Sequence, residues 1–84
     1  MAHVSNQVNP VDEVIDLQGD VCPYTLVKSK LAIENLEPGN VLEIHLGNSE
    51  SAANVPNTLD LEGHEILAID KPEASHWVVR VRRV

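Results

Sequence analysis

Cys22, the one cysteine in the chain, is the residue best suited to chemistry. It lies in the segment Gly19–Thr25 (GDVCPYT), between a stretch rich in β-branched residues and a helix-forming stretch. A cysteine at a helix start lies beside backbone N–H groups without partners and at the positive end of the helix dipole. Both favour the thiolate, which is the form that attacks sulfur. The alternative is that Cys22 is a small buried hydrophobic residue, as free cysteines often are.

The pattern of apolar residues around Cys22 predicts a strand followed by a helix. Residues 11–17 are rich in β-branched side chains and predict a strand, which ends at Gly19 and Asp20. The helix is expected to open at Cys22 and Pro23 and to run to about residue 36, because proline at the first helical position loses no hydrogen bond. Its apolar side chains, at roughly helical spacing, are Leu26, Val27, Leu31, Ile33 and Leu36.

The rest of the chain predicts three more strands and a second helix. Residues 41–46 alternate between apolar and polar side chains, which predicts a half-buried strand. Asn48 begins a helix expected over residues 48–62, and Pro56 either kinks this helix or marks its true start. Strands are expected over residues 64–70 and 76–83, joined by a loop over residues 71–75, with Trp77 as the aromatic anchor of the core.

These elements predict an α+β fold with the order β-α-β-α-β-β. It is expected to be a two-layer sandwich, in which a mixed sheet of four strands has both helices on one face and water on the other. Residues 1–10 are polar and without pattern, so we expect a flexible N-terminal tail. Residues 11–84 are then expected to form a single domain.

Composition argues against several classes of function. A net charge of −7 opposes nucleic-acid binding, which depends on Lys and Arg neutralising phosphates. A single cysteine, no apolar run long enough for a bilayer, and an N-terminus without a signal-peptide pattern favour a cytoplasmic location. Neither a metal nor a cofactor is expected, because the histidines are scattered without ligand spacing at His3, His45, His64 and His76.

The order and spacing of several motifs resemble the TusA/SirA family of small sulfur carriers. The matching residues are Leu17, Gly19, Cys22, Pro23, Glu37, Pro38, Gly39, Val55, Pro56, Gly63 and His64, so the resemblance covers about residues 12–83. It implies that Cys22 accepts sulfane sulfur as a persulfide from a cysteine desulfurase or a rhodanese-like protein. The sulfur would pass to an acceptor protein, toward tRNA thiolation, cofactor biosynthesis or sulfur metabolism. We expect a monomeric carrier, rather than a turnover enzyme, that binds neither nucleic acid nor membrane.

Thr25 departs from the family pattern, which has a second proline at this position. Unlike proline, Thr25 has an N–H, which is expected to point at the sulfur if Cys22 is the helix N-cap. The Thr25 hydroxyl is a second candidate donor. Gly19, Pro23 and Thr25 are therefore expected to support the helix start beside the sulfur. Two side chains near the sulfur are candidate contacts for partner proteins, Tyr24 and Lys28.

Two other functions are compatible with the sequence. The Cys-Pro-Tyr-Thr run resembles the Cys-Pro-Tyr-Cys of glutaredoxins with the second cysteine lost, and Val55-Pro56 resembles part of their Thr-Val-Pro loop. Here a polar, helix-like stretch follows Pro56, and without a resolving cysteine dithiol cycling is excluded. The other alternative is a non-catalytic regulatory module that binds through the solvent face of the sheet. On that face cross-strand charge pairs are expected among Glu43, His45, Arg80 and Arg82.

Overall fold

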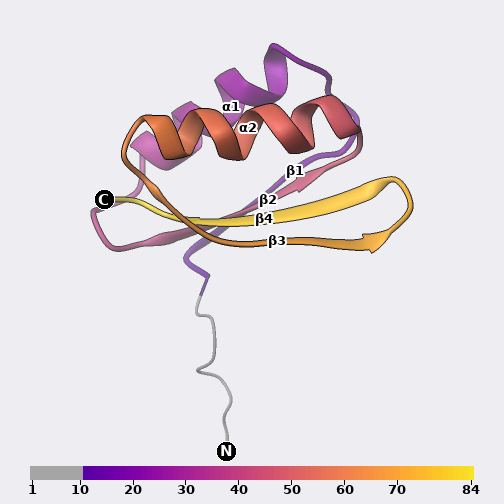
Figure 1. Cartoon of the computed structure of the whole chain (residues 1–84). Coiled ribbons are helices and arrows are strands. Elements are labelled where there is room, and N and C mark those ends of the chain that lie inside the picture. Colours follow the sequence, from indigo (N-terminus) through magenta and orange to yellow (C-terminus); the bar gives the residue numbers. More distant parts are fainter. Residues whose placement is uncertain (1–10) are drawn as a thin grey trace, which may run out of the picture.

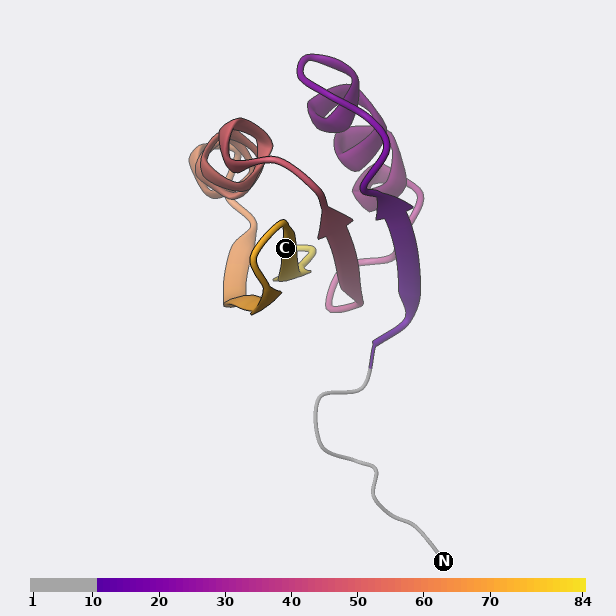
Figure 2. The ribbon, with the colours of Figure 1, turned by 90° about the vertical axis from the view of Figure 1, so that its right-hand side faces the viewer.

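The computed structural model describes residues 11–84, so the tail expected over residues 1–10 lies outside the described residues. The elements are β1 (Glu13–Leu17), α1 (Tyr24–Glu34), β2 (Val41–Leu46), α2 (Ser49–Leu61), β3 (Glu65–Glu73) and β4 (His76–Arg82). The strands form one sheet in the order β1-β2-β4-β3, with β1 parallel to β2 and β4 antiparallel to both of its neighbours. Figures 1 and 2 show both helices on one face of this sheet. The predicted α+β sandwich is confirmed.

The core lies between the sheet and the helices and is aliphatic. Every second side chain of the central strand β2 is fully buried, namely Leu42, Ile44 and Leu46. These side chains belong to one cluster with Val55 and Leu59 of α2. Because side chains alternate along a strand, Glu43 and His45 lie on the other face of β2, as the sequence predicts.

The buried face of α1 differs from the predicted one. Thr25, Ser29 and Ile33, spaced four residues apart, are fully buried, whereas Val27 and Leu31 are 51% and 56% exposed. The prediction that Val27 and Leu31 face the core was therefore wrong. The short side chains of Thr25 and Ser29 let α2 approach α1 closely, and this packing leaves Val27 and Leu31 facing outward. The buried Ser29 hydroxyl donates to the Thr25 carbonyl oxygen at 2.7 Å, so its polarity is satisfied within the helix.

The start and end of α2 follow ordinary capping rules. The helix begins at Ser49 and continues through Pro56, so Pro56 does not mark its start. The Asn48 side chain caps the helix by accepting a hydrogen bond from the Ser51 N–H at 2.8 Å. Gly63 follows the helix with a φ of +98°, which glycine adopts at little cost. Neither helix in the described part of the chain is long and apolar enough to cross a membrane.

β3 is longer than the sequence predicts. It runs to Glu73 rather than Asp70, so the predicted loop over residues 71–75 is mostly strand. Pro72 is tolerated because β3 is an edge strand, whose outward N–H groups need no partner strand. Trp77 is partly buried at the margin of the core rather than at its centre, and the Lys71 ammonium lies 5.0 Å from its ring centroid.

A polar cluster on the solvent face of the sheet joins β2 to β4. His45 Nδ1 lies 2.8 Å from His76 Nε2, and His45 Nε2 lies 2.7 Å from one oxygen of the Glu43 carboxylate. Arg80 Nε donates to the other oxygen at 3.0 Å, which confirms the predicted cross-strand pair. His45 and His76 are far apart in the sequence, and the antiparallel pairing of β2 with β4 brings them together.

Burial by itself raises the pKa of Glu43, but hydrogen bonds from His45 and Arg80 outweigh it and hold this pKa below its ordinary value of 4.5. Such a carboxyl stabilises the fold above its ordinary pKa, and the contribution is lost as the pH falls through the lowered value. We predict that acidification from neutral pH to about pH 3 lowers the unfolding free energy of the native protein by about 1 kcal/mol more than that of Glu43→Gln. Urea titrations measure both losses, with Glu13→Gln on the exposed end of β1 as the control. Equal losses in the native protein and Glu43→Gln would contradict the prediction.

Gly47 follows β2 directly and lies against the segment that leads to Cys22. A Cβ atom on Gly47 would lie 2.4 Å from the Gln18 carbonyl oxygen, whereas one on Gly19 would have no atom within 4 Å. We predict that Gly47→Ala lowers the free energy of unfolding by roughly 1–3 kcal/mol, as overpacking does. Gly19→Ala is expected to change it by less than about 0.5 kcal/mol. Urea unfolding of the two variants tests this contrast, and equal stabilities would sink it.

Candidate functional site

Cys22 lies where the starts of the two helices meet. Figure 1 shows α1 and α2 running in the same direction, with their first turns at the same end of the molecule. Cys22 is half-buried just before α1, and Ser51 belongs to the first turn of α2. Both helices therefore direct the positive end of their dipole toward the sulfur, which favours a negative charge there.

Two hydroxyl groups contact the sulfur. Thr25 Oγ1 lies 3.2 Å from Cys22 Sγ, Ser51 Oγ lies 3.3 Å from it, and the two oxygens are 2.8 Å apart. Thr25 and Ser51 are both fully buried. Within residues 11–84, these two hydroxyls are the hydrogen-bonding partners of the sulfur. The arrangement can stabilise a thiolate on one side while the other side of the half-buried sulfur stays open to a second molecule.

The backbone N–H of Thr25 does not point at the sulfur. α1 begins at Tyr24 with Pro23 as its N-cap, one residue later than predicted, and the Cys22–Pro23 peptide bond is cis. The N–H groups of Tyr24 and Thr25 are directed at the Val21 carbonyl oxygen, at 2.8 and 3.3 Å. The predicted contact from the Thr25 N–H was therefore wrong. The Thr25 hydroxyl, the second predicted donor, makes the contact with the sulfur.

The segment before Cys22 is tied to both helices. The Asn48 Nδ2 at the start of α2 donates to the Asp20 carbonyl oxygen at 3.1 Å. The Lys28 ammonium of α1 pairs with the Asp20 carboxylate at 3.0 Å. Lys28, a candidate partner contact, thus already has an acidic partner within the chain. Gly19 lies in the turn after β1 with open space around it, so sterics do not require glycine there.

Ser51 is the residue of the site that the sequence did not reveal. The capping pattern at Asn48 predicted that Ser51 lies in the first turn of a helix. Nothing in the pattern indicated that this turn lies beside a sulfur 29 positions earlier in the chain. That proximity depends on the parallel pairing of β1 with β2, which brings the residues after both strands to one end of the sheet.

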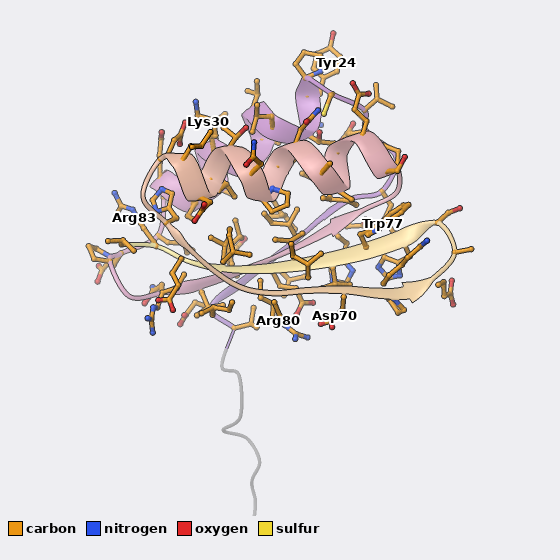
Figure 3. All side chains as sticks on the ribbon, in the orientation of Figure 1. Tyr24, Lys30, Asp70, Trp77, Arg80 and Arg83 are labelled. Carbon is orange, nitrogen blue, oxygen red and sulfur yellow. The ribbon has the colours of Figure 1, made fainter. Side chains whose placement is uncertain are left out.

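Exposed apolar side chains continue from Cys22 along α1. Val21, Tyr24, Val27 and Leu31 are 57%, 62%, 51% and 56% exposed. The last three are three and four residues apart, which places them on one side of the helix. Figure 3 shows Tyr24, a candidate partner contact, pointing away from the sheet. We call these four residues the α1 strip.

An open groove of about 460 Å³ lies elsewhere, between α2 and β3. Its lining includes Pro56 and Ile66 and does not include Cys22. This groove is therefore separate from the site at Cys22.

The resemblance to glutaredoxins fails at Val55 and Pro56. Both residues lie in the middle of α2 and are buried. In a glutaredoxin-like chain they would form a loop that leads into a strand. Because Val55 and Pro56 are helical, they no longer support the glutaredoxin alternative, which is left with the Cys-Pro-Tyr-Thr run alone.

A family model described as Sulfurtransferase TusA matches residues 13–83. A candidate sulfur carrier protein of Archaeoglobus fulgidus is 31% identical over 72 residues, which cover 86% of this chain and 82% of that one. A candidate sulfur carrier protein of Thermotoga maritima is 33% identical over 72 residues, which cover 86% and 91% of the two chains. The resemblance inferred from Cys22-Pro23 and the later motifs is therefore confirmed.

Solved structures share the fold. The SirA-like protein from Desulfitobacterium hafniense aligns with a TM-score of 0.73 at 24% identity, over 83% of this chain and 95% of that one. A protein from Helicobacter pylori aligns with a TM-score of 0.63 at 18% identity and the same coverage. The family model, which spans almost all of the described residues, and the relatives from Archaeoglobus fulgidus and Thermotoga maritima show that the chain belongs to the TusA family of sulfur carriers.

Proposed function

We propose that this protein accepts sulfane sulfur on Cys22 as a persulfide and passes it to an acceptor protein. The main support is a half-buried sulfur held by two buried hydroxyls at the joint start of two helices, in a chain of the TusA family. A single cysteine suits this chemistry, whereas dithiol exchange needs a second thiol. We place the protein in the cytoplasm, where a lone thiol stays reduced between transfers.

Loading is an exchange between two sulfur atoms and needs no oxidant. The Cys22 thiolate attacks the outer sulfur of a protonated donor persulfide and forms a new S–S bond with it. The S–S bond of the donor breaks, and its electron pair leaves with the inner sulfur of the donor as a thiolate. Cys22 then carries the sulfane sulfur and its proton, and the total charge is unchanged. Unloading to an acceptor thiolate repeats the step in the opposite direction.

The α1 strip is the surface on which we place the sulfur donor. It begins at Val21, directly before Cys22, and its exposed apolar side chains continue along α1 to Leu31. Most charged side chains near a functional interface lie at its rim, whereas aromatic and aliphatic side chains fill its centre. Tyr24, at 62% exposure beside the sulfur, is suited to that central position. The acceptor protein would use the same surface after the donor has left, so a single monomer can bind the donor and the acceptor in turn.

Incubation with a cysteine desulfurase and cysteine is expected to add one sulfur atom to the native chain, and a thiol reductant is expected to remove it. Cys22→Ser is expected to gain none, because a serine hydroxyl does not attack a persulfide at neutral pH. Intact-mass spectrometry measures both. Absence of a gain with desulfurase and rhodanese-type donors alike would contradict the proposal. A partner that binds Cys22→Ser as tightly as the native protein, with no sulfur transfer, would support the regulatory-module alternative instead.

Leu31→Asp is expected to slow sulfur loading about tenfold, because a charge in the centre of an apolar contact must be desolvated. Leu61→Asp is the matched control, since Leu61 is 78% exposed on α2, outside the α1 strip. Time-resolved intact mass at limiting desulfurase gives the rates, and circular dichroism confirms that both variants are folded. Equal slowing by the two variants would show that the strip is not the docking surface.

A further inference from the structure

Thr25 and Ser51 hold their hydroxyls in a fully buried setting, where a polar group needs a hydrogen-bonding partner. With Cys22 Sγ they form a triangle whose sides are 3.2, 3.3 and 2.8 Å. Within residues 11–84, neither side-chain oxygen has a hydrogen-bonding partner outside this triangle. These two hydroxyls, called here the hydroxyl pair, are therefore dedicated to the sulfur and to each other.

The number of protons in the triangle depends on the state of the sulfur. A thiolate only accepts, so the two hydroxyl protons can both be donated to it, or one can pass between the oxygens while the other reaches the sulfur. Either arrangement gives the anion at least one charge-assisted hydrogen bond, which is stronger than a neutral one. In the persulfide, the inner sulfur is neutral and a weak acceptor. The hydroxyl pair then retains only its mutual hydrogen bond, and one buried proton lacks a good acceptor.

We propose that the hydroxyl pair stabilises the Cys22 thiolate more than the Cys22 persulfide and so favours release of sulfur from the loaded protein. This inference rests on the proposed function. In release, an acceptor thiolate bonds to the outer sulfur, and the S–S bond to Cys22 breaks with its electron pair on Sγ. Sγ becomes the thiolate at the position where the hydroxyls already point. Thr25 and Ser51 are thus positioning residues that act on the leaving group.

A matched control for the hydroxyl pair lies one helical turn away. Ser29 is as fully buried as Thr25 and Ser51, but its hydroxyl donates to the Thr25 carbonyl oxygen rather than to the sulfur. Ser29→Ala therefore removes a buried hydroxyl from the same helix without touching the triangle. Thr25→Val keeps the side-chain volume and removes the hydroxyl, and Thr25→Ser keeps the hydroxyl as a conservative rescue.

The first measurement uses the protein without sulfur and needs no donor. The rate of alkylation by iodoacetamide is followed against pH, and its midpoint reports formation of the thiolate. Ser51→Ala and Thr25→Val are each expected to move this midpoint upward by about one pH unit, the effect of losing one charge-assisted hydrogen bond. Ser29→Ala and Thr25→Ser are expected to leave it unchanged. The charged residues Asp20 before Cys22, Lys28 of α1 and Glu50 in the first turn of α2 are retained in every variant.

The second measurement is the equilibrium of sulfur exchange between Cys22 and glutathione persulfide, quantified by intact mass. Ser51→Ala and Thr25→Val are expected to raise the loaded fraction, with an exchange constant about tenfold above that of the native protein, as one such hydrogen bond predicts. Ser29→Ala is expected to match the native constant. If Ser51→Ala and Thr25→Val load sulfur with the native constant, the inference is overturned while the proposed function stands. If neither the native protein nor any variant loads sulfur, the proposed function itself fails, whatever the alkylation profiles show.

Discussion

The parallel pairing of β1 with β2 is the constraint on which the site depends. Two parallel neighbours cannot be joined by a tight turn, so the chain must return over the sheet, and α1 makes this return. Both strands then end at the same end of the sheet, and the helices that follow them both begin there. The cysteine after the first strand and the serine after the second meet for this reason, although the sequence separates them widely. The strand order thus determines where the Cys22 sulfur lies, and the side chains around it determine its hydrogen bonds.

Close packing of the two helices adds the second level of organisation. Thr25 and Ser29 present short side chains where α1 faces the core and α2, and Lys30 of α1 pairs with Glu62 just beyond α2 at 2.8 Å. Because Thr25 and Ser29 occupy this face of α1, the larger side chains of Val27 and Leu31 remain in water. One packing choice therefore explains two features of the site: a sulfur within reach of α2, and an apolar helix surface left open beside it.

The fold was predictable from the sequence because its signals are local. Alternation in β2, the cap at Asn48 and glycine at position 63 each mark an element by its own residues. The buried side of α1 was not predictable, since hydrophobicity alone favours Val27 and Leu31 over Thr25 and Ser29. Of the site, Cys22 was predictable, because its residue type and its position before a helix are visible in the sequence. The contact with Ser51 and the meeting of the two histidines are tertiary facts, fixed by strand order and register rather than by spacing along the chain.

The sheet has two edge strands, β1 and β3, and the β3 edge bears on how the protein behaves in a crowded solution. β3 has no neighbour on its outer side, and unpaired strands tend to recruit other strands. Three features make this edge irregular: the register shifts twice along β3, Pro72 has no N–H to donate, and Glu73 places a negative charge at the end of the strand. Strand addition from another molecule is thereby disfavoured. The proposed sulfur carrier must part from each partner that it visits, and a β3 edge that disfavours strand addition is consistent with brief encounters.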